Sequence, residues 1–142
     1  MVEDNRNYQL GKLGKVLEDT MNLSELHTSN LIKLNSLVEF IPNMKESDYD
    51  DIVEYKILCS YILIGSIAKV TEYINELGYR IKSNGSTGER KYTTKDISNI
   101  IHEEYLGDNI KVKELYSMAR VLCTYNTFAN RGKLIPIEFK IE

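Results

Sequence analysis

Residues 57–64 read Ile-Leu-Cys-Ser-Tyr-Ile-Leu-Ile, a stretch in which only Ser60 is polar. A helix that is apolar on nearly every side has to be surrounded by other elements. We therefore expect this stretch to be the central buried element of a mainly helical fold. The helical pattern around it starts near Ser47 and continues without a proline to Leu77. Gly65 interrupts the apolar pattern, which therefore fits either one long central helix or two helices.

Helical spacing also precedes this stretch, over residues 7–22 and again over residues 24–41. Ser24 is a favourable N-cap residue for the second of these helices, and Pro42 is expected to end it. Two consecutive helices of similar length pack most simply against each other. The pattern therefore predicts an antiparallel helical hairpin over residues 1–42.

After the central stretch, the pattern changes from helix to strand. Residues 79–82 and 89–92 are short alternating segments around a loop of turn-forming residues, which predicts a β-hairpin. Thr93 is followed three residues later by Asp96, the spacing of a capping box. A short helix is therefore expected to start at Thr93 and to end at Gly107.

The end of the chain is expected to form a last helix over residues 111–128 and then a strand, which Pro136 restricts to the edge of a sheet. The fold class is thus mainly α with a small β-hairpin, an α+β arrangement of helical hairpin, long central helix, β-hairpin, two further helices and C-terminal edge strand. A winged-helix-like domain is one arrangement with this order. The 142 residues fit a single domain in three parts, namely 1–42, 47–107 and 111–142.

The composition is that of an ordinary globular protein, with 42% hydrophobic residues and a net charge of −3. No apolar run is long enough to span a membrane, and the acidic, polar start of the chain is unlike a secretory signal. Cys59 and Cys123 are expected to be buried, reduced thiols, which indicates a cytoplasmic protein. Many Ile, Lys, Asn and Tyr residues, whose codons are rich in A and T, indicate a low-GC bacterium, or one of its phages or plasmids.

The sequence contains no recognisable catalytic or metal-binding motif. His102 is followed by two glutamates but lacks the second histidine of the metalloprotease motif. Residues 85–91 contain glycines and a lysine, but Gly88 is followed by Glu89 where a phosphate-binding Walker loop has its lysine. The acidic residues 48–54 fit a solvated helix start. We therefore expect no enzymatic activity and no cofactor.

Residues 79–96, which we call the basic hairpin, form the candidate binding site together with Lys69. Cationic and small polar side chains are suited to contacts with phosphate groups. The candidate DNA-binding residues are Lys69, Arg80, Lys82, Asn84, Ser86, Thr87, Arg90, Lys91 and Lys95. Small loop residues would also let backbone N–H groups approach a phosphate. The same pattern fits a solvated surface hairpin whose Tyr79 and Tyr92 cover the core, and the sequence leaves both interpretations open.

Part of the chain, residues 67–107, resembles a segment of the DNA-binding recombinase domain of large serine recombinases. The resemblance lies in Ile67-Ala68-Lys69, in residues 73–80, in residues 92–101 and in Tyr105-Leu106-Gly107. In that family a helix precedes a short basic hairpin, and a Thr- or Ser-capped helix follows. The family's catalytic domain is absent from this chain, Tyr92 stands where the family usually has tryptophan, and the hairpin loop is longer. The resemblance therefore implies DNA contact and not strand exchange.

Two functions follow as hypotheses. In the first, the protein is a small, non-catalytic DNA-binding protein of a low-GC bacterium, phage or plasmid, and it forms a homodimer through its N-terminal helices. The exposed side of the helix before the hairpin, including Lys69 and residues 72–75, would face a DNA groove. In the second, the protein is a non-enzymatic interaction module or inhibitor from a mobile element that binds a host protein. Its 10 tyrosines suit that hypothesis, because tyrosine is common at interfaces.

Overall fold

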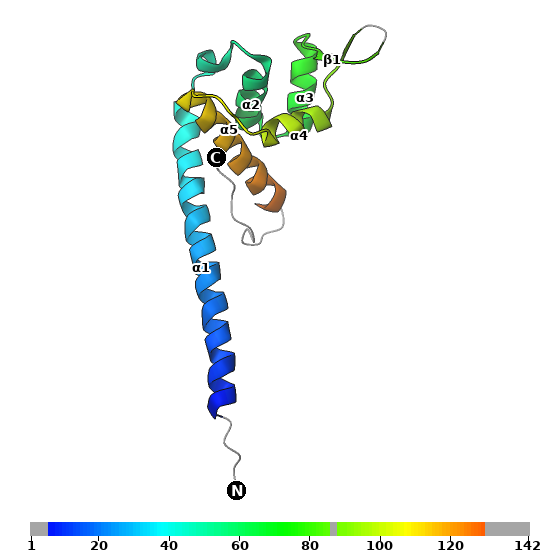
Figure 1. The fold of residues 1–142 in the computed structure, drawn as a ribbon. Helices are drawn as coiled ribbons and strands as arrows, with labels where there is room; N and C mark the ends of the chain where they lie inside the picture. The colour runs from blue at the N-terminus through cyan, green and yellow to red at the C-terminus, as the bar shows by residue number, and fades with distance from the viewer. Residues whose placement is uncertain (1–5, 86–87, 130–142) are drawn as a thin grey trace.

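A computed structural model of the chain describes residues 6–85 and 88–129, and Figure 1 shows their arrangement. The fold is mainly helical with one small antiparallel sheet of two strands, as the sequence predicts. The predicted C-terminal edge strand lies outside the described residues. No helix in the described ranges is both long enough and apolar enough to cross a membrane.

The predicted N-terminal helical hairpin is wrong. Residues 6–43 form a single helix, α1 (Arg6–Asn43), of 38 residues, which is about 57 Å at 1.5 Å per residue. Ser24 does not act as an N-cap, because it lies in the middle of α1, where its carbonyl accepts a hydrogen bond from the Thr28 hydroxyl at 2.9 Å. No glycine or proline lies between Gly14 and Pro42, so the helix has no strong breaker over that stretch. Pro42 lies in the last turn, close to the predicted end.

The predicted central helix consists of two helices, α2 (Val53–Ile64) and α3 (Ile67–Glu76), which Gly65 separates. Gly65 has φ = +77°, a left-handed conformation that glycine adopts without steric cost, and its N–H bonds to the Tyr61 carbonyl. Ser66 caps α3, accepting a hydrogen bond from the Lys69 N–H at 3.3 Å. The predicted helix start at Ser47 is wrong, because a 3₁₀ turn, η1 (Glu46–Tyr49), precedes α2.

Helix α2 is the centre of the core, as predicted. Residues 57–62 are buried, and α2 contacts η1, α3, α4 (Thr94–His102) and α5 (Ile110–Ala129). Helix α5 also contacts α1 and α4, and its residues 115–119 are all buried, so this helix is covered on more than one side. The largest fully buried side chains include Ile57, Leu58, Tyr61 and Leu115.

The predicted β-hairpin and the capped helix after it are also present. Strands β1 (Ile81–Lys82) and β2 (Glu89–Arg90) pair antiparallel, with Ile81 opposite Arg90. Thr93 and Asp96 form the complete capping box at the start of α4. Helix α4 ends at His102, five residues before the predicted stop at Gly107. A winged-helix arrangement is not established by these elements.

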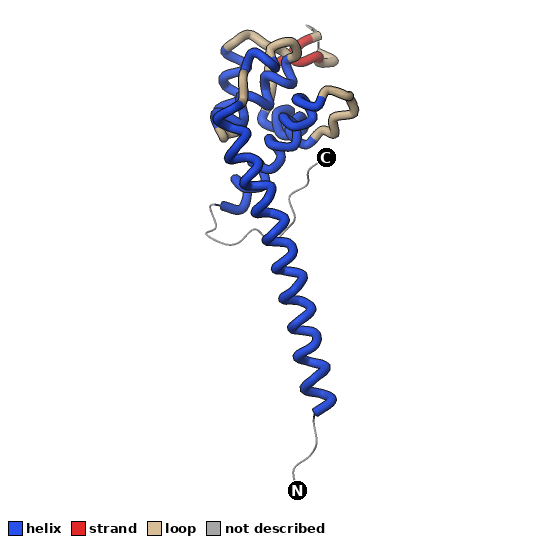
Figure 2. The backbone as a smooth tube through the Cα atoms, turned by 90° about the vertical axis from the view of Figure 1, so that its left-hand side faces the viewer, coloured by secondary structure: helices blue, strands red, loops and turns tan. Residues whose placement is uncertain are grey.

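The two ends of the molecule differ in character. The C-terminal half of α1 packs against α5, whereas its N-terminal half extends away from all other helices (Figures 1 and 2). The β-hairpin projects from the opposite end of the molecule, beyond α3 (Figure 1). The fold therefore presents two exposed features, a basic hairpin and a long protruding helix.

Candidate nucleic-acid interface

Asn75, near the end of α3, fixes the basic hairpin to the core. Its side-chain amide donates to the Tyr92 carbonyl at 2.9 Å, and its side-chain oxygen accepts from the Tyr92 N–H at 2.9 Å. This pair satisfies both backbone groups of Tyr92, whose ring is buried. The strand that leaves the hairpin is therefore held in a fixed position before α4 begins.

Asp96 forms a second anchor. Its carboxylate accepts two hydrogen bonds from the Arg90 guanidinium, at 2.6 and 2.9 Å, and two more from the backbone N–H and hydroxyl of Thr93, at 2.8 and 3.0 Å. The Arg90 bonds, with the Thr93 bonds in support, hold the pKa of the Asp96 carboxyl well below its ordinary value. One carboxylate thus links β2 to the N-terminus of α4.

The two hairpin arginines predicted as phosphate ligands both make intramolecular bonds. Arg80 donates to the Tyr79 carbonyl at 2.7 Å and to the Asn75 carbonyl at 3.2 Å, beside the C-terminal end of α3. A cation at that end interacts favourably with the helix dipole. Arg90 is engaged with Asp96 and also with the Lys91 carbonyl at 3.0 Å. Both arginines therefore support the shape of the hairpin.

The lysines of the predicted site differ from the arginines. Lys69, Lys82, Lys91 and Lys95 are all exposed, and within residues 6–85 and 88–129 their ammonium groups make no hydrogen bond or ion pair. Lys82 lies on β1, Lys91 follows β2 and Lys95 lies in the first turn of α4. These three lysines are placed on or beside the hairpin with their charges directed to solvent, and they are the cations best able to meet an anionic partner.

The backbone amides of the hairpin loop are used within the loop. The N–H groups of Ser83 and Gly88 bond to the carbonyls of Gly88 and Gly85, both at 3.0 Å, and the Gly85 N–H bonds to the Ser83 hydroxyl at 3.2 Å. An N–H already donating in this way cannot serve as a phosphate ligand without losing that bond. Asn84 is exposed. Ser86 and Thr87, which the sequence also predicts as ligands, lie outside the described residues.

The exposed face of α3 does not share the positive charge of the hairpin. Lys69 is accompanied on that helix by Glu72 and Glu76, and all three are exposed. Ile74 is fully buried and Asn75 faces Tyr92, so the prediction that residues 72–75 all lie on an exposed, groove-facing side is wrong. Two carboxylates against one ammonium would oppose close approach of a phosphate backbone.

Helix α4 adds one polar position that sequence reasoning did not identify. Asn99 lies one helical turn after Lys95 and is exposed in the same way, and the exposed His102 follows three residues later. The helical period counted from Lys95 was the signal that could have found it. A polar face of α4 therefore continues the hairpin surface.

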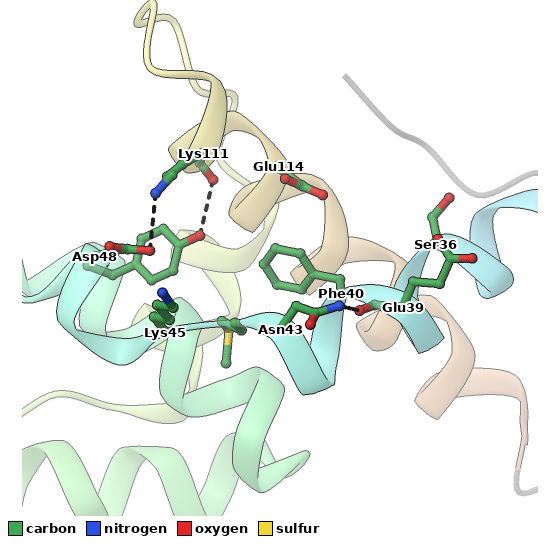
Figure 3. Close-up of a pocket in the computed structure, with 10 residues that line it drawn as sticks. Ser36, Glu39, Phe40, Asn43, Lys45, Asp48, Lys111 and Glu114 are labelled. Carbon is green, nitrogen blue, oxygen red and sulfur yellow. Dashed lines mark hydrogen bonds and ion pairs between the residues drawn. The ribbon is translucent and has the colours of Figure 1, made fainter.

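A hollow lies at the other end of the fold, between α1, η1 and α5 (Figure 3). It has a volume of about 480 Å³ and is lined by both signs of charge, including Glu39, Lys45 and Glu114. Its polar groups bond to one another: Lys111 pairs with Asp48 at 3.3 Å, and the Tyr49 hydroxyl lies 3.5 Å from the Lys111 carbonyl. These contacts tie η1 to the start of α5, so we regard the hollow as a structural contact between these elements.

Two observations bear on chemistry at other positions. Cys59 and Cys123 are free thiols, and burial raises the pKa of the Cys59 thiol to about 11, so that it is protonated and a poor nucleophile at neutral pH. Within the described part of the chain, no group of three or more His, Cys, Asp or Glu side chains is placed to hold a metal ion.

Comparison of the chain with protein-family models, with curated proteins and with solved structures gives no match. The side chains of the basic hairpin are therefore the basis for the function proposed below.

Proposed function

We propose that this protein is a small, non-catalytic DNA-binding protein that contacts the phosphate backbone through its basic hairpin. The observation that carries the proposal is the distribution of charge. Residues 79–96 contain five cationic and two acidic side chains, a balance of +3, within a chain whose net charge is −3. The remaining residues therefore carry −6. A local cationic surface on an acidic protein directs a polyanion to one place.

The hydrogen bonds that hold the hairpin to the rest of the fold also support the proposal. Asn75 and Asp96 anchor its base through six hydrogen bonds, so Lys82, Lys91 and Lys95 are presented from a fixed framework. Because the base of the hairpin is already fixed, the site loses less conformational entropy when it binds its partner. Because phosphate groups occur at every nucleotide, contacts of this kind give affinity without sequence preference.

Lysine acetylation followed by mass spectrometry tests where DNA would bind. With an A/T-rich duplex present, Lys82, Lys91 and Lys95 are expected to react more slowly than in the free protein, because bound phosphates restrict reagent access. Lys45 and Lys113, which are also exposed but lie outside the basic hairpin, serve as internal controls and are expected to react at an unchanged rate. Equal protection of all five lysines, or protection of the two controls alone, would contradict the proposed site.

A second candidate function, a non-enzymatic protein-interaction module, is favoured by the exposed apolar side chains of α1. That function would be supported by a defined partner whose association with the chain survives nuclease treatment and is lost when α1 is changed. Such a result would leave the hairpin lysines as a solvated surface.

A further inference from the structure

The N-terminal half of α1 exposes a row of apolar side chains. Leu10, Leu13, Leu17 and Met21, which we call the α1 stripe, recur at helical spacing and are each between 56% and 66% exposed. Single apolar residues on a surface are ordinary, whereas a continuous row of large ones marks an interaction surface. No other element among residues 6–85 and 88–129 covers the stripe, so it is open to a partner.

The stripe does not face the domain to which α1 belongs. Helix α1 is buried at Asn30 and Leu37, which lie on one side of the helix. At 100° per residue, the α1 stripe lies on nearly the opposite side. A partner helix can therefore lie along the stripe without displacing α5 or any other element that α1 contacts.

The charges beside the stripe indicate which partner fits. Residues 6–15 carry three basic side chains and no acidic one, whereas residues 18–25 carry three acidic side chains and no basic one. The basic segment also lies at the positive end of the helix dipole. Its side chains and the dipole therefore both disfavour a positively charged partner beside this end of α1. It is complementary to an acidic helical segment, and the chain's own residues 18–25 are such a segment.

We propose that a second copy of this chain docks antiparallel on the α1 stripe, so that the basic segment of each copy lies beside the acidic segment of the other. A two-fold axis near Val16 and Leu17 brings each segment beside its complement and opposes the two helix dipoles. A parallel pair in register would instead place basic beside basic and acidic beside acidic.

The geometry of the chain is compatible with this arrangement. With the axis between residues 16 and 17, residue 27 of one copy lies level with Arg6, the first residue of α1, of the other. The domains therefore begin where the partner helix ends, and they sit at opposite ends of the paired helices. The inference does not depend on DNA binding, because the α1 stripe and the basic hairpin share no residue.

Sedimentation equilibrium of the full chain tests the dimer. The wild-type protein is expected to reach twice its monomer mass of 16.4 kDa as concentration rises. Leu17→Glu is expected to remain monomeric, because it places a carboxylate in the apolar contact. Asn22→Glu adds the same charge at an exposed position away from the stripe and is expected to leave the dimer intact. Circular dichroism should show unchanged helix content in both variants.

Charge reversal tests the orientation. Lys12→Glu with Lys15→Glu is expected to raise the dissociation constant about tenfold or more at low salt, and adding Glu18→Lys and Asp19→Lys is expected to restore it. A parallel pair would predict no loss from the first change. A wild-type protein that stays monomeric at all concentrations, or a Leu17→Glu variant that still dimerises, would overturn the proposed interface and leave the stripe to a different partner.

Discussion

Replacing Lys82 and Lys91 by glutamate is expected to weaken binding to duplex DNA by about two to three orders of magnitude at low salt. Each lysine that meets a phosphate releases a condensed counterion, and each glutamate in its place repels the backbone. The loss should be similar for unrelated duplex sequences, because phosphate contacts carry no sequence information. Fluorescence anisotropy with a labelled duplex measures the change.

The matched control is Lys45→Glu with Lys113→Glu, which changes the net charge by the same amount at two exposed positions outside the basic hairpin. It is expected to weaken binding only slightly. Equal losses in the two double variants would show that overall charge, and not the hairpin, determines binding. Lysines are the better targets, because truncating Arg90 would also remove the partner of Asp96 and alter the hairpin itself.

The second large effect concerns stability. Asp96→Ala is expected to lower the free energy of unfolding by roughly 1.5–3 kcal/mol at neutral pH, the range for hydrogen bonds to a charged group. It removes the capping box of α4 and the tie between β2 and that helix. Asp51→Ala, an exposed aspartate with no such contacts, is the control and should change stability by less than about 0.5 kcal/mol. Urea denaturation measures both.

The contribution of Asp96 to the free energy of unfolding is expected to depend on pH. The pKa of Asp96 is lower in the folded protein than its ordinary value of 3.8, so its contribution is fully present above that value and is lost as pH falls towards the folded pKa. The difference in stability between wild type and Asp96→Ala should therefore be constant at neutral pH and begin to shrink as the pH falls below about 4. A difference that stays constant into the acid range would show that the carboxylate charge is not the source of the effect.

The sequence predicted correctly those features that are determined by residues close together in the chain. The capping box at Thr93 depends on two residues three positions apart, and the turn at Gly78 depends on a single glycine with φ = +91°. The buried character of residues 57–62 follows from their own composition. Each of these features was predictable because the residues that decide it are neighbours in the chain.

The errors arose where the outcome depends on residues distant in sequence. The helical patterns of residues 7–22 and 24–41, separated only by Leu23, fit a hairpin or one continuous helix, and nothing local decides between them. Likewise, Arg90 and Lys91 are adjacent cations, yet one pairs with Asp96 and the other faces solvent. Only the path of the backbone shows which cation of the candidate site remains available to a ligand.

The central claim is that the hairpin lysines bind DNA phosphates, and the salt dependence of duplex binding by the wild-type protein tests it most directly. We expect the logarithm of the association constant to fall linearly with the logarithm of salt concentration, with a slope of about −2 to −3 for contacts by Lys82, Lys91 and Lys95. Absence of binding at low salt, or binding that does not change with salt, would contradict the account.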